Sequence, residues 1–229
     1  MKIPKNRKEL KKDIKQEYLY EPLEAIKILK DKSYVKFDET IDVAINLTID
    51  TNKSDQNIKG VLNLPKGSGK KIKVAVLASS DKHQEAKDSN ADIVGGEDLI
   101  VKLETGKFDF DLLIATPDMM PSLGKVAKVL GPKGLMPNPK MGTVTKDIAV
   151  AVKNAKSGQI KFKNDKSGIV HAGIGKLSFN ESDILENLKS FYATIVKSKP
   201  DNTKGSYIKK VTIASTMGLG LEINHASLR

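Results

Sequence analysis

Hydrophobic and polar residues alternate along three stretches near the two ends of the chain, and this pattern predicts β-strands. The clearest stretch is residues 41–49, where Ile, Val and Leu at the odd positions alternate with polar or small residues. Residues 207–213 and 219–223 follow a looser version of the same pattern. Such alternation is typical of antiparallel sheets with one covered face. We therefore expect the two chain ends to share one antiparallel sheet.

Helical periodicity flanks these strands. Apolar residues spaced three or four apart predict helices over 6–18 and 182–197, and Pro22 suits the first position of a helix over 22–31. The middle of the chain differs, because residues 72–78, 91–94 and 112–115 are nearly continuous apolar runs, as in strands buried on both faces of a parallel sheet. Further helices are predicted between and after these runs, over 82–89, 97–104, 122–130 and 147–155.

Strands that alternate with helices form βαβ units, so the fold class is predicted as α/β with two domains. Residues 1–66 and 160–229 are expected to form a split α+β domain, with residues 67–159 inserted as a parallel α/β domain. The joints would be the polar, glycine-bearing segments 66–70 and 156–159, which together suit a hinge.

The composition points to a polyanionic partner. The net charge is +11, and lysine supplies 37 of the 39 basic residues, with Arg7 and Arg229 as the others. Counted by segment, residues 1–16 carry +5, residues 80–120 carry −6 and residues 121–176 carry +9. Charge this polarised favours a surface dedicated to nucleic acid over one that serves solubility alone. Because lysine lacks the planar fork that reads guanine, we expect contacts with backbone and shape.

Several kinds of chemistry find little support. The chain has no cysteine, which excludes disulfides, thiol nucleophiles and cysteine-ligated metals. The glycine-bearing stretches 67–71, 173–175 and 218–220 each break a nucleotide-binding motif and are interpreted as turns or hinges. Acids at 92, 97 and 98 are better explained by a helix N-terminus than by an acid–base pair. We expect no enzyme, cofactor or metal site; a nucleotide-dependent enzyme that uses the central domain is the alternative.

The start of the chain has no apolar core of a signal peptide, and no apolar run approaches the ~20 residues that span a bilayer. A soluble, intracellular protein without a membrane partner is therefore expected.

Three segments stand out as candidate contacts. Residues 131–142 hold three prolines and three glycines, which favours a stiff basic loop that either meets a ligand or plugs the sheet end with Leu135 and Met136. Segments 36–40 and 215–218 each place an apolar side chain beside hydroxyls near a strand end. They could meet ribose and phosphate, although composition alone favours Phe37 and Met217 as core residues.

Five motifs, in order along the chain, closely resemble the bacterial L-one family of large-subunit ribosomal proteins. They are residues 37–40, 91–97, 115–120, 131–140 and 215–218, and the similarity extends from about residue 30 to residue 223. The resemblance implies a split domain that grips large-subunit rRNA and a Rossmann-like inserted domain without nucleotide chemistry. It also implies a monomer when free and a place on the cytoplasmic ribosome, on the mobile stalk that helps release deacylated tRNA from the exit site. Repression of translation through its own operon mRNA is implied as well.

Carried over to this sequence, the resemblance assigns RNA-binding residues to both halves of the split domain. These are Lys36, Phe37, Thr40, Lys166, Ser167, His171, Lys176, Ser178, Thr216, Met217 and Gly218. A secondary rRNA contact would involve Gly131, Lys133, Gly134, Asn138 and Lys140. Three departures from the family pattern are Lys66 for His, Lys133 for Arg and Leu219 for Pro; the second keeps the attraction for phosphate but loses bidentate geometry.

Overall fold

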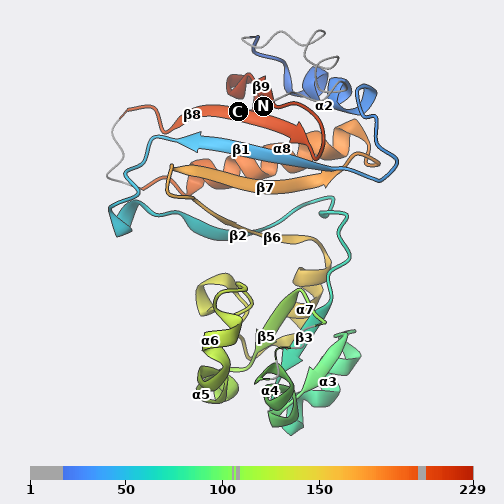
Figure 1. Cartoon of the computed structure of the whole chain (residues 1–229), viewed down its shortest axis with the longest axis vertical. Coiled ribbons are helices and arrows are strands. Elements are labelled where there is room, and N and C mark those ends of the chain that lie inside the picture. Colours follow the sequence, from blue (N-terminus) through green and yellow to red (C-terminus); the bar gives the residue numbers. More distant parts are fainter. Residues whose placement is uncertain (1–17, 105, 107–108, 201–204, 229) are drawn as a thin grey trace. The chain divides into compact units, whose positions relative to one another are not determined.

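The structure is a computed structural model that describes residues 18–104, 106, 109–200 and 205–228. The chain folds into two compact units, residues 1–69 with 160–229 and residues 70–159, and each is described here by itself (Figure 1). The expected α/β class is confirmed, with antiparallel pairing in the first unit and a parallel sheet in the second. The predicted helix over 6–18 lies, apart from Tyr18, outside the described residues.

The first unit, called the split unit below, is built on a four-stranded antiparallel sheet in the order β7-β1-β8-β9. Its strands are β1 (Thr40–Leu47), β7 (Ile169–Lys176), β8 (Ile208–Ser215) and β9 (Leu221–Ile223). Thr40 pairs with Lys176, and Ile41 pairs with Ser215. The first residues of β1 therefore lie beside the last residues of both neighbouring strands.

Two helices, α2 (Pro22–Asp31) and α8 (Glu181–Lys197), cover one face of this sheet, and α8 is seen behind the strands in Figure 1. Both were predicted. Their apolar stripes, which include Ile26, Leu188 and Phe191, are buried against the side chains of β1 that alternate inward. The polar and small residues of β1 point to the opposite face, which no helix of the described residues covers.

Three strands of the split unit were not predicted: β7 itself, and the two-stranded sheet of β2 (Lys59–Asn63) and β6 (Gln159–Lys163). In β7, His171 and two glycines hide the alternation. The interpretation of residues 173–175 as a turn or hinge is wrong, because they lie inside this strand. A Cβ on Gly173 would come within 3.2 Å of Thr40 Cγ2, so the small residue permits close packing against β1.

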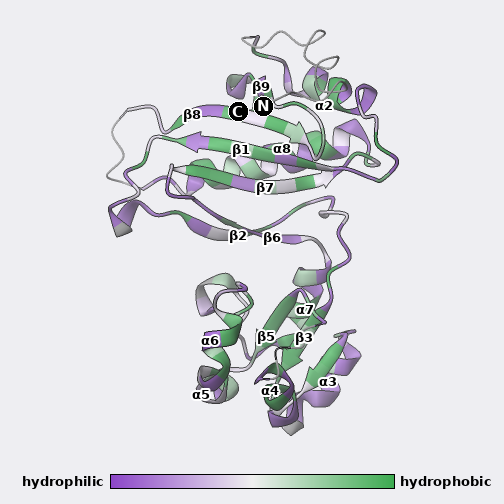
Figure 2. Ribbon diagram, in the orientation of Figure 1, coloured by the Kyte–Doolittle hydropathy of each residue, from purple (hydrophilic) through white to green (hydrophobic). Residues whose placement is uncertain are grey.

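The second unit, called the inserted unit, contains a parallel sheet in the order β4-β3-β5. Its strands are β3 (Val74–Leu77), β4 (Ile93–Gly95) and β5 (Leu112–Ala115), and its longer helices are α3 (His83–Asp88), α4 (Glu97–Glu104) and α7 (Ile148–Lys156). Strands β3 and β5 are buried along their whole length and appear hydrophobic throughout in Figure 2. Separate apolar clusters cover the two faces, as continuous apolar strands require.

The predicted helix over 122–130 is broken into three short pieces, α5 (Met120–Leu123), a 3-10 turn (Gly124–Val126) and α6 (Ala127–Leu130). Gly124 lies at the break, where its conformational freedom weakens the helix. The apolar periodicity nevertheless marked the core correctly, because Leu123, Val126 and Leu130 are fully buried.

The remaining sequence features are structural. Gly67 and Gly69 have φ of 72° and 70°, as expected for turn residues. Glu97 and Asp98 occupy the first turn of α4, where acids are favoured. Among the described residues, no helix is long and apolar enough to cross a membrane, and no cluster of His, Asp and Glu could hold a metal ion.

Candidate nucleic-acid interface

The residues that enter β1 and the turn after β8 meet at one corner of the split unit, although 176 positions separate Thr40 from Thr216. The backbone N–H of Thr40 donates to Thr216 Oγ1 at 3.0 Å, and the same hydroxyl lies 3.3 Å from the carbonyl oxygen of Thr40. The hydroxyl of Tyr34 reaches the carbonyl of Met217 at 3.5 Å. Segments 37–40 and 215–218 therefore form one surface, called the corner below.

Two apolar side chains project from this corner into solvent. Phe37 is 56% exposed and Met217 is 47% exposed. The interpretation of these two residues as core is therefore wrong, because neither α2, α8 nor the strands bury them. They supply flat and flexible apolar surface beside polar groups, which is the combination that unstacked bases and riboses contact.

Gly218 leaves room for a side chain only if the hydroxyl of Ser215 moves. A Cβ at this position would collide with Ser215 Oγ, and the turn is closed by the N–H of Gly218 donating to the carbonyl of Ser215 at 3.2 Å. Leu219, which replaces the proline usual in the family pattern, is half-buried in the same turn. Hydrogen bonds to segment 37–40 thus hold the turn at a position where the proline ring is missing.

The end of β7 completes the corner. Lys176 Nζ donates to Thr40 Oγ1 at 2.8 Å, and Ser178 donates to Asp38 through its N–H at 3.1 Å and its hydroxyl at 2.8 Å. Lys36 is exposed and makes no ion pair within the described part of the chain. Seven predicted residues therefore gather at the corner with Lys36 beside them: Phe37, Thr40, Lys176, Ser178, Thr216, Met217 and Gly218.

Lys166 and Ser167 lie elsewhere, in the turn that enters β7, and both are exposed. Ser167 N donates to Asp165 Oδ1 at 2.8 Å, and the carbonyl of Lys166 accepts from Thr51 at 2.8 Å. Hydrogen bonds, first among them the one from the N–H of Ile169, lower the pKa of Asp165. This turn adjoins the far end of β1, about 24 Å from the corner at ~3.4 Å per residue.

The uncovered face of the sheet connects the two groups. His171 is exposed on β7 opposite Ala44, and its Nε2 lies 3.7 Å from Asp165. Asp42 lies on β1 between Ala44 and the corner. Desolvation raises the pKa of Asp42, and the charges of Lys176 and His171 oppose that shift. The predicted residues of the split unit are thus not one cluster but a line along the open face, with the carboxylates of Asp38, Asp42 and Asp165 among them.

The predicted secondary contact lies in the inserted unit, in the loop after α6. Gly131, Lys133 and Gly134 are exposed, whereas Leu135 and Met136 pack against the core. The base of the loop therefore packs on the core through Leu135 and Met136, as one alternative predicted, whereas a ligand contact at its exposed tip stays a prediction. Two hydrogen bonds with Thr143 fix the half-buried Asn138: its backbone N–H donates to Thr143 Oγ1 at 2.8 Å, and its carbonyl accepts from the same hydroxyl at 3.2 Å. Lys140 follows in a 3-10 turn.

Sequence reasoning did not assign the acidic residues and the tyrosine that organise the corner. Glu39, Asp38 and Tyr34 each form a hydrogen bond across the segments described above. The available signal was the consecutive acid pair in segment 37–40, since carboxylates next to a proposed phosphate-binding surface need partners of their own.

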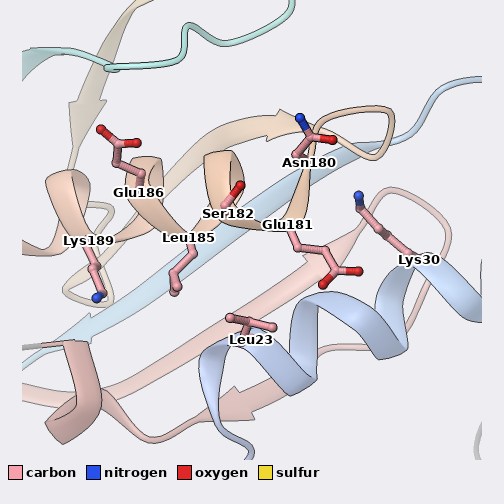
Figure 3. Close-up of a pocket in the computed structure, with 8 residues that line it drawn as sticks. All are labelled: Leu23, Lys30, Asn180, Glu181, Ser182, Leu185, Glu186 and Lys189. Carbon is pink, nitrogen blue, oxygen red and sulfur yellow. The ribbon is translucent and has the colours of Figure 1, made fainter.

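A pocket of about 700 Å³ opens on the other side of the split unit, between α2 and α8 (Figure 3). Its lining carries both signs of charge, from Lys30, Lys189, Glu181 and Glu186, and includes the apolar side chains of Leu23 and Leu185. None of the predicted RNA-binding residues lines it. Mixed charge of this kind does not favour a polyanion, so the corner remains the better candidate.

Comparison with known proteins identifies the family. A sequence model described as the Ribosomal protein L1p/L10e family matches residues 29–219. Large ribosomal subunit protein uL1 of Rickettsia akari (strain Hartford) is 49% identical over 221 residues, which cover 96% of this chain and 92% of that protein. The uL1 protein of Rickettsia bellii (strain OSU 85-389) is 51% identical over 215 residues, covering 94% and 90%. The chain, as its five motifs indicated, belongs to the Ribosomal protein L1p/L10e family.

Proposed function

We propose that this ribosomal protein binds a folded region of large-subunit rRNA through the split unit, with the corner as the specific contact. The observation that carries the proposal is the pair of exposed apolar side chains, Phe37 and Met217, on backbone that hydrogen bonds hold in place. A preformed apolar surface beside hydroxyls and lysines suits RNA whose bases are splayed out of a helix.

Lysines supply the long-range attraction. Lys36 and Lys176 flank the apolar pair, Lys166 lies at the far end of the open face, and none of the three is buried. Point charges of this kind neutralise phosphates without reading base edges. Specificity would then come from the fit of the corner to one folded RNA, and affinity would come largely from charge.

Membership of a family of ribosomal proteins argues against the nucleotide-dependent enzyme considered above. The structure offers it no support either, because the glycine-bearing segment 67–71 lies before β3 and does not join a parallel strand to a helix. We therefore interpret the inserted unit as a carrier of RNA contacts. We propose the exposed tip of its loop, with Gly131, Lys133 and Gly134, as the secondary rRNA contact.

The finer roles are proposals that follow from the family resemblance. We propose that the protein forms part of the mobile stalk of the large subunit, takes part in release of deacylated tRNA from the exit site, and represses its own operon mRNA. Sequencing of the RNA that co-purifies with the protein from its own cells tests the partners together. Recovery of large-subunit rRNA without the operon mRNA would remove the repressor role and leave the structural role intact.

Filter binding to an rRNA stalk fragment across a salt series tests the main proposal. If about six phosphates are neutralised, the logarithm of the affinity should fall with the logarithm of salt concentration at a slope of roughly −4 to −5. An unrelated RNA duplex is the control, and the stalk fragment should bind more tightly at every salt concentration. Equal binding of both RNAs, or no dependence on salt, would contradict the proposal.

A further inference from the structure

Glu39 is a buried carboxylate beneath the surface that we propose binds RNA. Only 1% of the residue is exposed, so it cannot touch RNA from its place beneath the corner. Burying an ion is costly unless hydrogen bonds compensate it. Hydrogen bonds must therefore stabilise the buried charge of Glu39, and its hydrogen-bond partners indicate its role.

The carboxylate joins two segments that both carry proposed RNA contacts. Oε1 accepts from the hydroxyl of Ser33 at 2.6 Å, and Oε2 accepts from the backbone N–H of Met217 at 2.8 Å. The hydroxyl of Ser215 is a third donor. Burial alone would raise the pKa of Glu39, but these hydrogen bonds outweigh it and leave the pKa lowered. The group is thus an ionised acceptor at neutral pH.

The N–H of Met217 explains why an acceptor is needed here. Met217 lies in a tight turn after β8, and its exposed side chain extends from a backbone that the carboxylate holds from below. Without Glu39, that N–H would lose its acceptor beneath the corner, and Ser215, whose hydroxyl limits the space around Gly218, would lose one as well. Both losses favour a turn of different shape.

We propose that Glu39 is a positioning residue for RNA recognition, which fixes the turn at Met217 relative to Phe37 without contacting RNA itself. The inference rests on the proposed function, because it assigns a role to the support of that same surface. The neighbouring Asp38 anchors the other side of the segment through its two bonds to Ser178, so Phe37 and Thr40 flank a pair of carboxylates that are both engaged in hydrogen bonds.

Two substitutions separate positioning from general stability. Glu39→Met keeps a similar volume but removes every acceptor, so we expect the affinity for the rRNA stalk fragment to fall about 10- to 100-fold. Glu39→Gln keeps one carbonyl oxygen for the N–H of Met217, and its amide can donate to a serine oxygen; we expect a loss of about threefold to tenfold. Glu181→Met and Glu181→Gln are matched controls, because Glu181 is partly exposed on α8 and forms a surface ion pair with Lys27.

The readouts are the dissociation constants for the stalk fragment and for an unrelated duplex, the slope of affinity against salt, and the melting temperature. A positioning role predicts weaker binding to the stalk fragment, with unchanged binding to the duplex and an unchanged salt slope, because no phosphate contact is removed. Equal losses on both RNAs, or a changed slope, would overturn it. So would wild-type binding by a folded Glu39→Met protein.

If Glu39→Met does not fold, Glu39→Gln decides, and wild-type affinity in that variant overturns the inference. A wild-type protein that does not prefer the stalk fragment over the duplex would instead refute the proposed function. A wild-type preference that both Glu39 variants retain would refute only the role of Glu39.

Discussion

Replacement of Phe37 by Ala is the most direct test of the corner as an RNA-binding surface. With 56% of the residue exposed and an accessible area for phenylalanine on the order of 200 Å², about 110 Å² remains to be covered by a partner. At about 25 cal/mol per Å² this corresponds to at most ~3 kcal/mol, and stacking of one base on an aromatic ring contributes about 1–3 kcal/mol. We expect the stalk fragment to bind about 5- to 30-fold more weakly, a loss of about 1–2 kcal/mol.

The same substitution affects folding less directly. The covered part of Phe37 is about 90 Å², which sets an upper limit of ~2 kcal/mol for the loss in free energy of unfolding. Phe37→Leu separates the two effects, because it retains much of the apolar contact with the protein but removes the flat ring. Filter binding and urea denaturation of both variants give the two free energies independently.

Val101→Ala is a suitable control, since Val101 is 61% exposed on α4 of the inserted unit and is not one of the proposed contact residues. It should bind the stalk fragment like the wild type. The reasoning is refuted if Phe37→Leu also binds like the wild type, or if Phe37→Ala loses affinity only in proportion to the fraction of unfolded protein.

Three further predictions concern other residues. Gly218→Ala should weaken binding to the stalk fragment at least tenfold, because its Cβ displaces a neighbouring hydroxyl. Gly124→Ala is the control: this position has open space and a helical φ of −55°, so the substitution should leave folding stability unchanged or raise it by about 0.5–1 kcal/mol. Binding and melting curves compare the two variants. Asp42→Asn should strengthen binding by about 0.5 kcal/mol for each phosphate at ~7 Å, because it removes a repulsive charge. The pKa of Asp42 is raised, so protonation of Asp42 as pH falls should increase the affinity of the wild type, and the variant lacks this increase. Binding titrations between pH 7 and 4.5 test this. Asp92→Asn should lower the free energy of urea unfolding by about 0.5–1 kcal/mol at pH 7 and by little at pH 2. The hydrogen bond from the backbone N–H of Val74 lowers the pKa of Asp92, so its stabilisation is present above the unfolded pKa of ~4 and is lost as pH falls through the lowered pKa. An equal loss at both pH values would argue against this.

Local patterns in the sequence determined most of the elements and the fold class. The alternation of 41–49 predicted β1, the apolar stripe of 182–197 predicted α8, and the continuous apolar runs predicted the parallel sheet of β3, β4 and β5. These succeed because periodicity records which face of an element is buried. Strand β7 was missed because its glycines are explained by the close approach of β1, and a local sequence pattern does not show that contact.

The arrangement of the candidate site was decided only by the tertiary structure. The sequence supplied Phe37, Thr40, Thr216 and Met217 through a family resemblance, while composition favoured two of them as core. They meet because of the register of β1 against β8, which brings together residues 176 positions apart. The proposed role of Glu39 also depends on the tertiary structure, because its carboxylate accepts from the N–H of Met217, which lies 178 positions away in the sequence. A hydrogen bond depends on distance and direction in space, and sequence separation carries neither.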